Sequence, residues 1–406
     1  MSLESEAEFY FKLLPLLKAS SNSTVFSPSS ILNSLAIIYF GSDGNTAKQI
    51  SDIIGKGKTE KEILKYYVAF VKRHKSEDKV ISQIINKKKK DDTEEVNLPR
   101  KRRFLDPKDD PNAKVNVNIA NGIFVSENVS LVPEFEELIL NSFDAKIQST
   151  NFAETEKAVE EINKFVSEKT KENIKEIVTA EDIFGKTSLI LVNAIHFIGT
   201  WHLPFDKEDT KDILFNSNPP REISMMKNMV PPSAEGWNYQ EGKDWQALGI
   251  PYVHCQHSFF IVLPKEKDGL SDLIKNFDFS LFKQCTKRQK ISRTTHILIP
   301  IMEIKATIDL VEKLSNFGIT DVFSFECNLS KMLQGSNRIE KALHKAIIKV
   351  DEKGTVASAA NVFRAIPRSS GINTFNATHP FLYFITSNNG TKSMAPKDIL
   401  FMGTFC

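Results

Sequence analysis

One stretch near the C-terminus constrains the fold most, because it can be either an exposed loop or a buried strand. Residues 350–371 read VDEKGTVASAANVFRAIPRSSG, with no proline before Pro367. In a strand, side chains alternate between two faces, and one face would carry Thr355, Ala357, Ala359 and Asn361. This small, uncharged face fits inside a sheet without overpacking it. Alanine and serine form strands poorly, so a helix start or surface loop is the better interpretation of the run alone, and its flanks must decide.

Length and charge describe an ordinary globular chain. The 406 residues allow two or three domains or one large mixed unit with an ample core. Its 53 basic and 51 acidic residues nearly cancel, so net charge gives no argument for nucleic acid as the main partner. No apolar run is long enough to span a membrane. We therefore expect no membrane partner, and any basic binding site must be local.

The N-terminus and the cysteines indicate a reducing compartment. The chain begins MSLESEAE, and residues 9–17 include Lys12 and Pro15, which suits neither the charge nor the length of a secretory signal. Four scattered cysteines suit free thiols; they are Cys255, Cys285, Cys327 and Cys406. We expect a cytoplasmic and monomeric protein, with nuclear location as an open alternative.

Helix signals dominate the first half and strand signals the second, which predicts an α+β chain. Ser5 and Glu8 have capping-box spacing for a helix over 5–18, and Thr59 with Glu62 repeats it for a helix to His74. Apolar residues surround the predicted helix 28–41, so it should be buried. A helix is also expected over 154–178. The predicted strands include 115–125, 188–201, 296–304 and 344–350.

Residues 75–114 form a charged segment unlike its surroundings. They hold 12 basic and 9 acidic residues in blocks and few apolar ones, which predicts an exposed, disordered insertion. Two basic clusters have the spacing of a bipartite nuclear-import signal: Lys87, Lys88, Lys89, Lys90 and Arg100, Lys101, Arg102, Arg103. A solvated loop is the simplest interpretation, import through a receptor the next, and binding of a polyanion the third, because acidic blocks weaken it.

Enzyme and cofactor motifs fail on inspection. Residues 185–187 (GKT) lack the glycine of a phosphate loop, and residues 55–57 (GKG) lack the third glycine of a dinucleotide fold. His254, Cys255 and His257 lie close together but offer no fourth metal ligand, so packing is the better interpretation. We expect no enzyme activity, no cofactor and no metal.

Four motifs in order resemble the serpin family, intracellular type. They are FSPSSI at 26–31, NAIHFIGTW at 193–201, HKAIIKVDEKGT at 344–355, and HPFLYF at 379–384 followed by FMG at 401–403. The resemblance covers the chain from about residue 5, apart from the insertion. It implies a single serpin domain over 1–406 with three β-sheets, about nine helices and an exposed reactive-centre loop, here residues 352–376, that can insert as a strand into the largest sheet.

The resemblance also implies how the loop works. Counting from Glu352 puts the reactive bond between Arg368 and Ser369. A serine protease would attack the Arg368 carbonyl and form an acyl-enzyme, after which the loop inserts and distorts the tethered enzyme. Arginine there points to a trypsin-like target. Two alternatives stay open. Arg368 is a solvated loop arginine and the reactive bond lies one or two residues away, or the bond follows Arg364.

The hinge and the sheet-opening region follow from the same resemblance. The hinge has no charged, bulky or proline residue from Gly354 to Ala360; its residues are Glu352, Gly354, Thr355, Val356, Ala357, Ser358, Ala359 and Ala360. This favours inhibition over a non-inhibitory binding protein, and inhibition of an arginine-accepting cysteine protease is a third reading. The sheet-opening residues are Ser27, Pro28, Ser30, Asn193, Trp201 and His344.

Two positions depart from the family pattern. Ile301 stands where many serpins carry a lysine that pairs with the residue matching Glu352, and Ser23 replaces a usual asparagine. From the resemblance we expect both changes to alter how readily the sheet opens.

Deleting residues 86–104 tests the import hypothesis. If the basic clusters are read by an import receptor, the deletion lowers the nuclear fraction of a tagged protein in cells. Replacing the acidic residues of 91–95 by asparagine and glutamine, which keeps both clusters and the nine residues between them, should leave that fraction unchanged. Equal nuclear fractions for the parent and the 86–104 deletion would rule the import hypothesis out.

Overall fold

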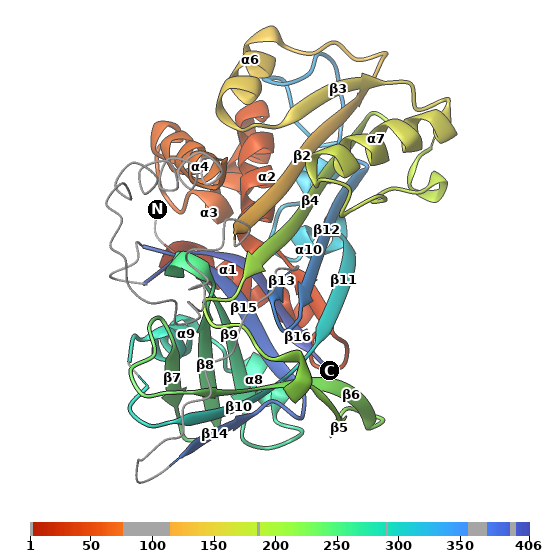
Figure 1. Cartoon of the computed structure of the whole chain (residues 1–406). Helices are drawn as coiled ribbons and strands as arrows, with labels where there is room; N and C mark the ends of the chain where they lie inside the picture. Colours follow the sequence, from red (N-terminus) through yellow and green to blue (C-terminus); the bar gives the residue numbers. More distant parts are fainter. Residues whose placement is uncertain (1–2, 76–113, 185–186, 290, 356–371, 390–394) are drawn as a thin grey trace, which may run out of the picture.

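The computed structural model describes residues 3–75, 114–184, 187–289, 291–355, 372–389 and 395–406. The described residues form nine α-helices and three β-sheets, as the sequence predicted. The charged segment 75–114, apart from its two end residues, and the loop residues 356–371 lie outside them. Figure 1 shows the sheets stacked along the length of the molecule.

The main sheet has the strand order β11-β12-β4-β2-β3, with the short strand β13 paired to β4. β4 lies at its centre, and every residue of β4 but Ile198 is buried, as expected for a strand apolar on both faces. The bounds are β2 (Val115–Ser126), β3 (Lys146–Thr150), β4 (Leu189–Thr200), β11 (Met302–Asp309), β12 (Lys341–Val350) and β13 (Gly354–Thr355).

The other two sheets lie below the main sheet in the view of Figure 1. A six-stranded sheet has the order β1-β16-β15-β9-β8-β7, and a four-stranded sheet has the order β14-β10-β6-β5. Their bounds are β1 (Thr24–Phe26), β5 (Lys211–Phe215), β6 (Arg221–Val230), β7 (Asn238–Glu241), β8 (Trp245–Pro251), β9 (His257–Pro264), β10 (Thr295–Pro300), β14 (Asn373–Asn376), β15 (Phe381–Asn388) and β16 (Pro396–Phe405).

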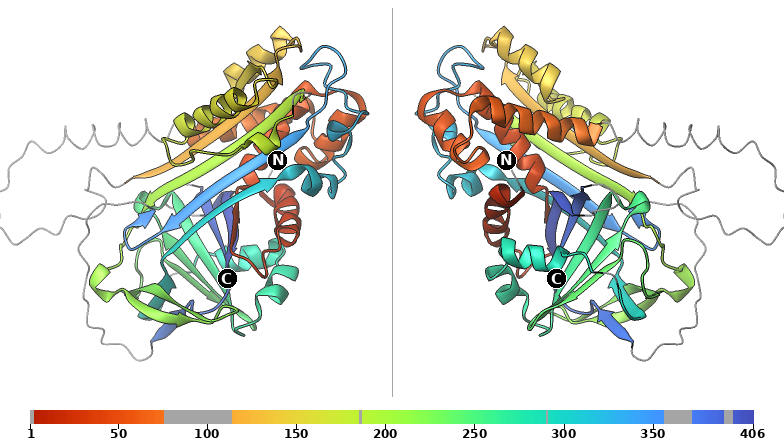
Figure 2. Two further views of the ribbon diagram at one scale, coloured as in Figure 1. Left: turned by 90° about the vertical axis from the view of Figure 1, so that its right-hand side faces the viewer. Right: turned by 90° about the vertical axis from the view of Figure 1, so that its left-hand side faces the viewer.

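Helices cover the main sheet on both faces (Figure 2). On one face, Ile162, Phe165 and Val166 of α7 pack against Ile190 and Val192 of β4. On the other lies α2, in which every residue except Tyr39 is buried. The bounds are α1 (Leu3–Leu16), α2 (Pro28–Gly41), α3 (Gly44–Ile54), α4 (Glu60–Lys75), α6 (Pro133–Ser142), α7 (Thr155–Lys169), α8 (Leu270–Lys275), α9 (Phe279–Thr286) and α10 (Leu310–Ser315).

Three local predictions are wrong. The first helix begins at Leu3, and Glu8 pairs with Lys12 and Lys56 instead of closing a capping box with Ser5. α7 ends at Lys169, because the positive φ angles of Lys171 and Glu172 cannot continue a right-handed helix.

The third is the predicted strand 296–304, which divides at Ile301 into β10 and β11, in two different sheets. The alternation of apolar residues is the same in both strands. It therefore gives no sign of the point at which the chain passes from one sheet to the other. The capping box of Thr59 and Glu62 does form, with the Thr59 backbone N–H donating to Glu62 Oε2 at 3.0 Å.

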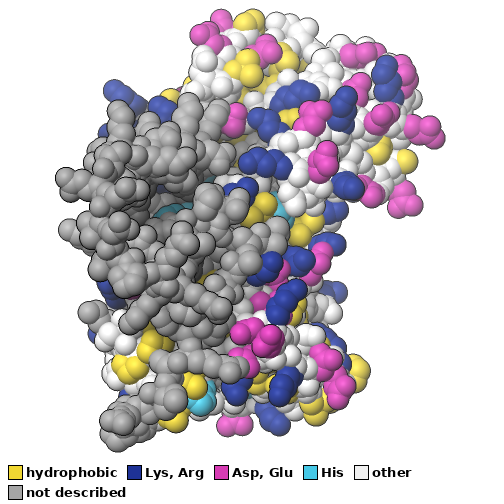
Figure 3. Space-filling view, in the orientation of Figure 1, with side chains coloured by type: hydrophobic (Ala, Val, Ile, Leu, Met, Phe, Trp, Pro, Cys, Tyr) yellow, Lys and Arg dark blue, Asp and Glu magenta, His cyan; other side chains and the backbone are white. Residues whose placement is uncertain are grey.

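The exposed surface carries charges of both signs. Figure 3 shows Lys and Arg interspersed with Asp and Glu over the described part of one face, as the net charge of +2 leads one to expect. None of the described helices has the length and apolar character needed to cross a bilayer.

Candidate functional site

The site is organised around the boundary between β12 and β4. Seven parallel residue pairs join the two strands, from Lys341 with Ile190 to Ile347 with His196. We call these pairs the β12–β4 seam. Beyond them both strands continue without pairing to each other, and the hinge strand β13 takes the free edge of β4: Gly354 pairs with Thr200 and Thr355 with Gly199, antiparallel. The first hinge residues therefore lie where the two strands separate (Figure 1).

A buried hydrogen bond crosses the middle of the seam. His344 of β12 pairs with Asn193 of β4, and their side chains meet at 2.5 Å between His344 Nδ1 and Asn193 Oδ1. The backbone N–H of Ser27, which caps α2, donates to His344 Nε2 at 2.9 Å. Because Nε2 accepts, Nδ1 carries the proton and donates to Asn193. Both side chains are fully buried.

The amide of Asn193 continues this network beneath the sheet. Its Nδ2 donates to Ser30 Oγ at 2.7 Å and to Asn121 Oδ1 at 2.5 Å. Asn121 Oδ1 also accepts from Ser34 Oγ at 3.0 Å. The network thus joins α2, β2, β4 and β12. Five of the six predicted sheet-opening residues meet here, since Pro28 begins α2 directly after the Ser27 cap.

Trp201, the sixth predicted residue, lies apart from the network. It follows β4 eight residues after Asn193, about 26 Å along an extended chain. Its Nε1 donates to the Asp351 carbonyl oxygen at 2.9 Å, and its ring stacks on Tyr252 with a centroid distance of 4.5 Å. Its backbone N–H donates to the Lys353 oxygen at 3.0 Å. Trp201 therefore supports the turn that leads into the hinge.

The structure explains why a glutamate and a glycine occupy positions 352 and 354 of this turn. Glu352 is 6% exposed, and its Oε1 accepts from Thr210 Oγ1 at 2.8 Å. The described residues contain no lysine or arginine paired with it, as the loss of lysine at Ile301 suggested. Gly354 has a φ of +131°, and a Cβ there would lie 2.1 Å from the Gly199 oxygen. Only glycine fits this backbone and this close approach.

Ser23, the second departure, bonds to the C-terminal residue instead of entering the network. Its Oγ donates to the Cys406 oxygen at 3.2 Å and accepts from the Cys406 backbone N–H at 2.9 Å.

Sequence reasoning missed Asn121 and Ser34, which complete the network. The sequence held a signal for Asn121: in VNVNIAN, residues 115–121, the third asparagine breaks the alternation and falls on the opposite face from Asn116 and Asn118. A lone polar residue among apolar neighbours on a core face usually has a buried partner.

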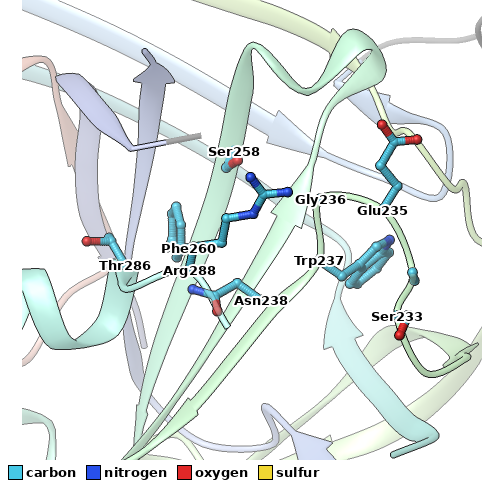
Figure 4. A pocket seen from close by; sticks show the side chains of 10 residues that line it. Ser233, Glu235, Gly236, Trp237, Asn238, Ser258, Phe260, Thr286 and Arg288 are labelled. Carbon is cyan, nitrogen blue, oxygen red and sulfur yellow. The ribbon is translucent and has the colours of Figure 1, made fainter. Parts of the chain in front are cut away.

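A cavity of about 160 Å³ lies away from the seam, lined by the loop 233–237, β7, β9 and the end of α9 (Figure 4). Trp237 and Asn238 line one side, and the Arg288 side chain reaches in beside Ser258 and Phe260. His254 and Cys255 lie in the adjacent turn Val253–Cys255 (η4), with His257 at the start of β9. The described residues hold no cluster of metal-ligating side chains.

Comparison with known proteins now identifies the fold and the family. The fold is that of uncleaved ovalbumin, with a TM-score of 0.78 at 21% identity, covering 100% of this chain and 99% of that one. The family model described as "Serpin (serine protease inhibitor)" matches residues 4–406. The chain belongs to the serpin family.

Two curated relatives match nearly full length. One is the leukocyte elastase inhibitor of Xenopus tropicalis, 30% identical over 95% of this chain and 93% of its own length. The other is human Serpin B3, 29% identical over 99% of this chain and 98% of its own length.

Protonation of His344 should weaken the seam. Burial lowers the pKa of His344 to about 3 from 6.5, because the charged ring would lose its hydration. His344 therefore binds a proton less readily in the folded state than in the unfolded state. Its contribution to the free energy of unfolding is fully present above pH 6.5 and is lost as the pH falls toward 3. From pH 7.5 to 5, this residue alone should cost about 2 kcal/mol.

The measurement is the urea midpoint across this pH range for the parent and His344→Gln. The pKa values of His257 and His196, lowered to about 3 and 4 by burial, act in the same direction. That of Glu6, raised to about 7 by burial, acts in the opposite one. These contributions cancel in the difference between the two proteins, so the variant should show a shallower pH dependence. Parallel curves would contradict a role for His344.

Proposed function

We propose that this protein is a suicide inhibitor of a trypsin-like serine protease, with Arg368–Ser369 as its reactive bond. The carrying observation is the antiparallel pairing of Gly354 and Thr355 with the free edge of β4. It supports a loop that extends this strand along the seam once the loop is cut. A relative named as an elastase inhibitor supports the inhibitory class.

The register of β13 predicts where each loop residue would lie after insertion. Each further loop residue moves one residue back along β4, so Ala357 would face Phe197 and Ala359 would face Ile195. Directly opposed residues in antiparallel strands point to the same face, and Phe197 and Ile195 belong to the buried core. The small uncharged residues would thus enter the core face.

Asn361 would reach the centre of the network. On β4 the register brings it opposite Asn193, and on β12 the pairing of Gly354 with Asp351 brings it opposite His344. Insertion would separate these two side chains and break their hydrogen bond. The Asn361 amide can both donate and accept, so it would bridge the two groups and leave neither unpaired. In the inserted state, the hydrogen bonds of Asn361 would thus replace the lost hydrogen bond between His344 and Asn193.

The length of β4 agrees with the reactive bond at Arg368. Continued along β4, the register reaches Leu189, the first residue of the strand, at Ala365. Pro367, which has no N–H to give a ladder, and Arg368 would then lie beyond the strand. Fourteen residues from Thr355 to Arg368 span about 46 Å when extended, enough to carry a tethered enzyme far along the molecule.

The location, the partners and the oligomeric state are further proposals. Four free cysteines, two of them buried, support a reducing, cytoplasmic location. The basic clusters at 87–90 and 100–103 support nuclear import or polyanion binding. We also propose that the protein is a monomer, because each reactive loop acts on one enzyme molecule. It would have no membrane partner and no enzyme activity of its own.

Mixing with trypsin tests the inhibitor directly. The parent should form a complex of the two masses that survives boiling in detergent, because the acyl bond is covalent. Arg368→Ala should lose the complex, while Arg364→Ala should retain it. Cleavage of the loop without a complex would indicate the alternative, a non-inhibitory binding protein. If the protein instead forms complexes with arginine-cleaving cysteine proteases and not with trypsin, it is an inhibitor of cysteine proteases, the second alternative.

Thr355→Arg should turn the inhibitor into a substrate. The inserted strand would have to bury an unpaired charge beside Gly199, which is costly. The ratio of cleaved to complexed protein after reaction with trypsin should rise at least tenfold. Val356→Arg is the matched control, because it puts the same charge on the opposite face beside the half-buried Ile198. Equal ratios for Thr355→Arg and the parent would exclude insertion.

A further inference from the structure

The end of the β12–β4 seam that lies away from the hinge is closed by a side chain as well as by the backbone. The seam begins there with Lys341 and Ile190. The carboxylate of Glu340 accepts from the backbone N–H groups of Ser188 at 3.2 Å and Leu189 at 3.1 Å, and from Ser188 Oγ at 3.1 Å. The Glu340 backbone N–H donates to the Leu189 oxygen at 3.1 Å. We call these contacts the Glu340 clasp.

The clasp joins the two strands that would have to separate. Leu189 is the first residue of β4, whereas Glu340 leads directly into β12. Glu340 also lies 3.5 Å from Arg338 Nε, but this pair is within one segment and would survive a separation of the strands. Only 21% of the Glu340 side chain is exposed, and hydrogen bonds to an ionised carboxylate are about twice as strong as those between neutral groups. Opening this end of the seam is therefore costly.

An inserting loop would meet the clasp last. Continued from Gly354, the register of β13 sets Ala365 opposite Leu189 on β4 and opposite Glu340 on the β12 side. Complete insertion would therefore part Glu340 from β4. Insertion as far as Phe363 would leave the clasp closed.

The loop has no side chain to replace the contacts of the clasp. At the network, the amide of Asn361 could both donate and accept. The residues that would meet Glu340 are Ala365 and Ile366, whose side chains have no polar group. The hydrogen bonds of the Glu340 carboxylate to β4 would thus be lost without a substitute from the loop side chains.

The neighbouring salt bridge differs from the clasp in this respect. Lys341 Nζ lies 3.4 Å from Asp182, which precedes β4, and 3.3 Å from Asp309 of β11. Arg364 would enter between Ile190 and Lys341 and point to the same face. Its guanidinium would be able to take over Asp182, while Lys341 keeps Asp309. Of these two contacts, only the clasp would be lost without a replacement.

The uncut loop is too short to reach the clasp. The seven residues that follow Ile366, up to Asn373 where β14 begins, span at most about 25 Å. β4 extends over about 36 Å from Leu189 to Thr200, and β14 lies beyond the Thr200 end (Figure 1). The clasp can therefore act only on a loop that has been cut.

We propose that Glu340 is a positioning residue that opposes the last step of insertion of the cut loop. It acts at the point where a tethered enzyme would reach the end of its path, and so lowers the share of cut protein that completes insertion. This role rests on the proposed inhibitory function.

Two synthetic peptides test the proposal on the full chain without any protease. The long peptide TVASAANVFRAI copies residues 355–366 and would reach the clasp. The short peptide TVASAANVF copies residues 355–363 and would end two residues before it. Each carries a fluorescent label at its N-terminus, and its dissociation constant is measured by fluorescence anisotropy.

Glu340→Ala is the decisive variant. It should bind the long peptide about tenfold more tightly than the parent, because one hydrogen bond to a charged group changes a binding constant by about that factor. It should bind the short peptide as the parent does. Glu340→Gln keeps the size and one acceptor oxygen, so its affinity for the long peptide should be intermediate.

Glu303→Ala is the matched control. Glu303 pairs with Lys305 of its own strand at 2.6 Å, and that strand, β11, is the outer strand of the main sheet beside β12. The variant should bind both peptides with the parent's affinities.

Two results would overturn the role of Glu340. Equal tightening of both peptides by Glu340→Ala would mean that Glu340 supports the whole seam, and unchanged binding of the long peptide would mean that the clasp opens at no cost. If the parent still forms its complex with trypsin, either result excludes the role of Glu340 alone. If neither peptide binds and no complex forms, the proposed insertion itself is excluded.

Discussion

The hydrogen bond between His344 and Asn193 is the contact on which the closed sheet depends. It lies inside the β12–β4 seam, is fully buried, and is held from both ends by groups of α2. A buried polar contact of this kind is costly to break unless another group replaces it. In the proposed insertion, Asn361 would be the polar residue that replaces this contact, because the register of β13 would bring it opposite Asn193.

The hinge lies beyond one end of the β12–β4 seam, and the network crosses its middle. At the hinge, Gly354 approaches the Gly199 backbone, and Trp201 and Tyr252 support the turn below it. At the network, α2 ties the seam closed. In the proposed insertion, the loop would begin where β12 and β4 already separate and would pass three pairs of the seam before it reaches His344 and Asn193. In the proposed insertion, the energetic barrier would lie about seven residues into the loop, not at its start.

Much of the fold and part of the site could be predicted from the sequence. The buried helix 28–41 and the central strand 188–201 were recognisable because uninterrupted apolar character survives without any tertiary context. The crossing at Ile301 was not, because both strands keep the same period while the chain changes sheets. Asn121 and Ser34 were missed because a polar residue acquires its role only from partners that are distant in the chain.

The sequence by itself determined the family, the uncharged hinge and the arginine placed before Ser369, since these depend on residue identity and order. Only the tertiary structure decided that four predicted residues form one network, with Pro28 beside it, while Trp201 supports the turn instead. It also set the register that links Gly354 to Thr200. Pairing and burial depend on distances between segments far apart in the chain, and no local pattern encodes those distances.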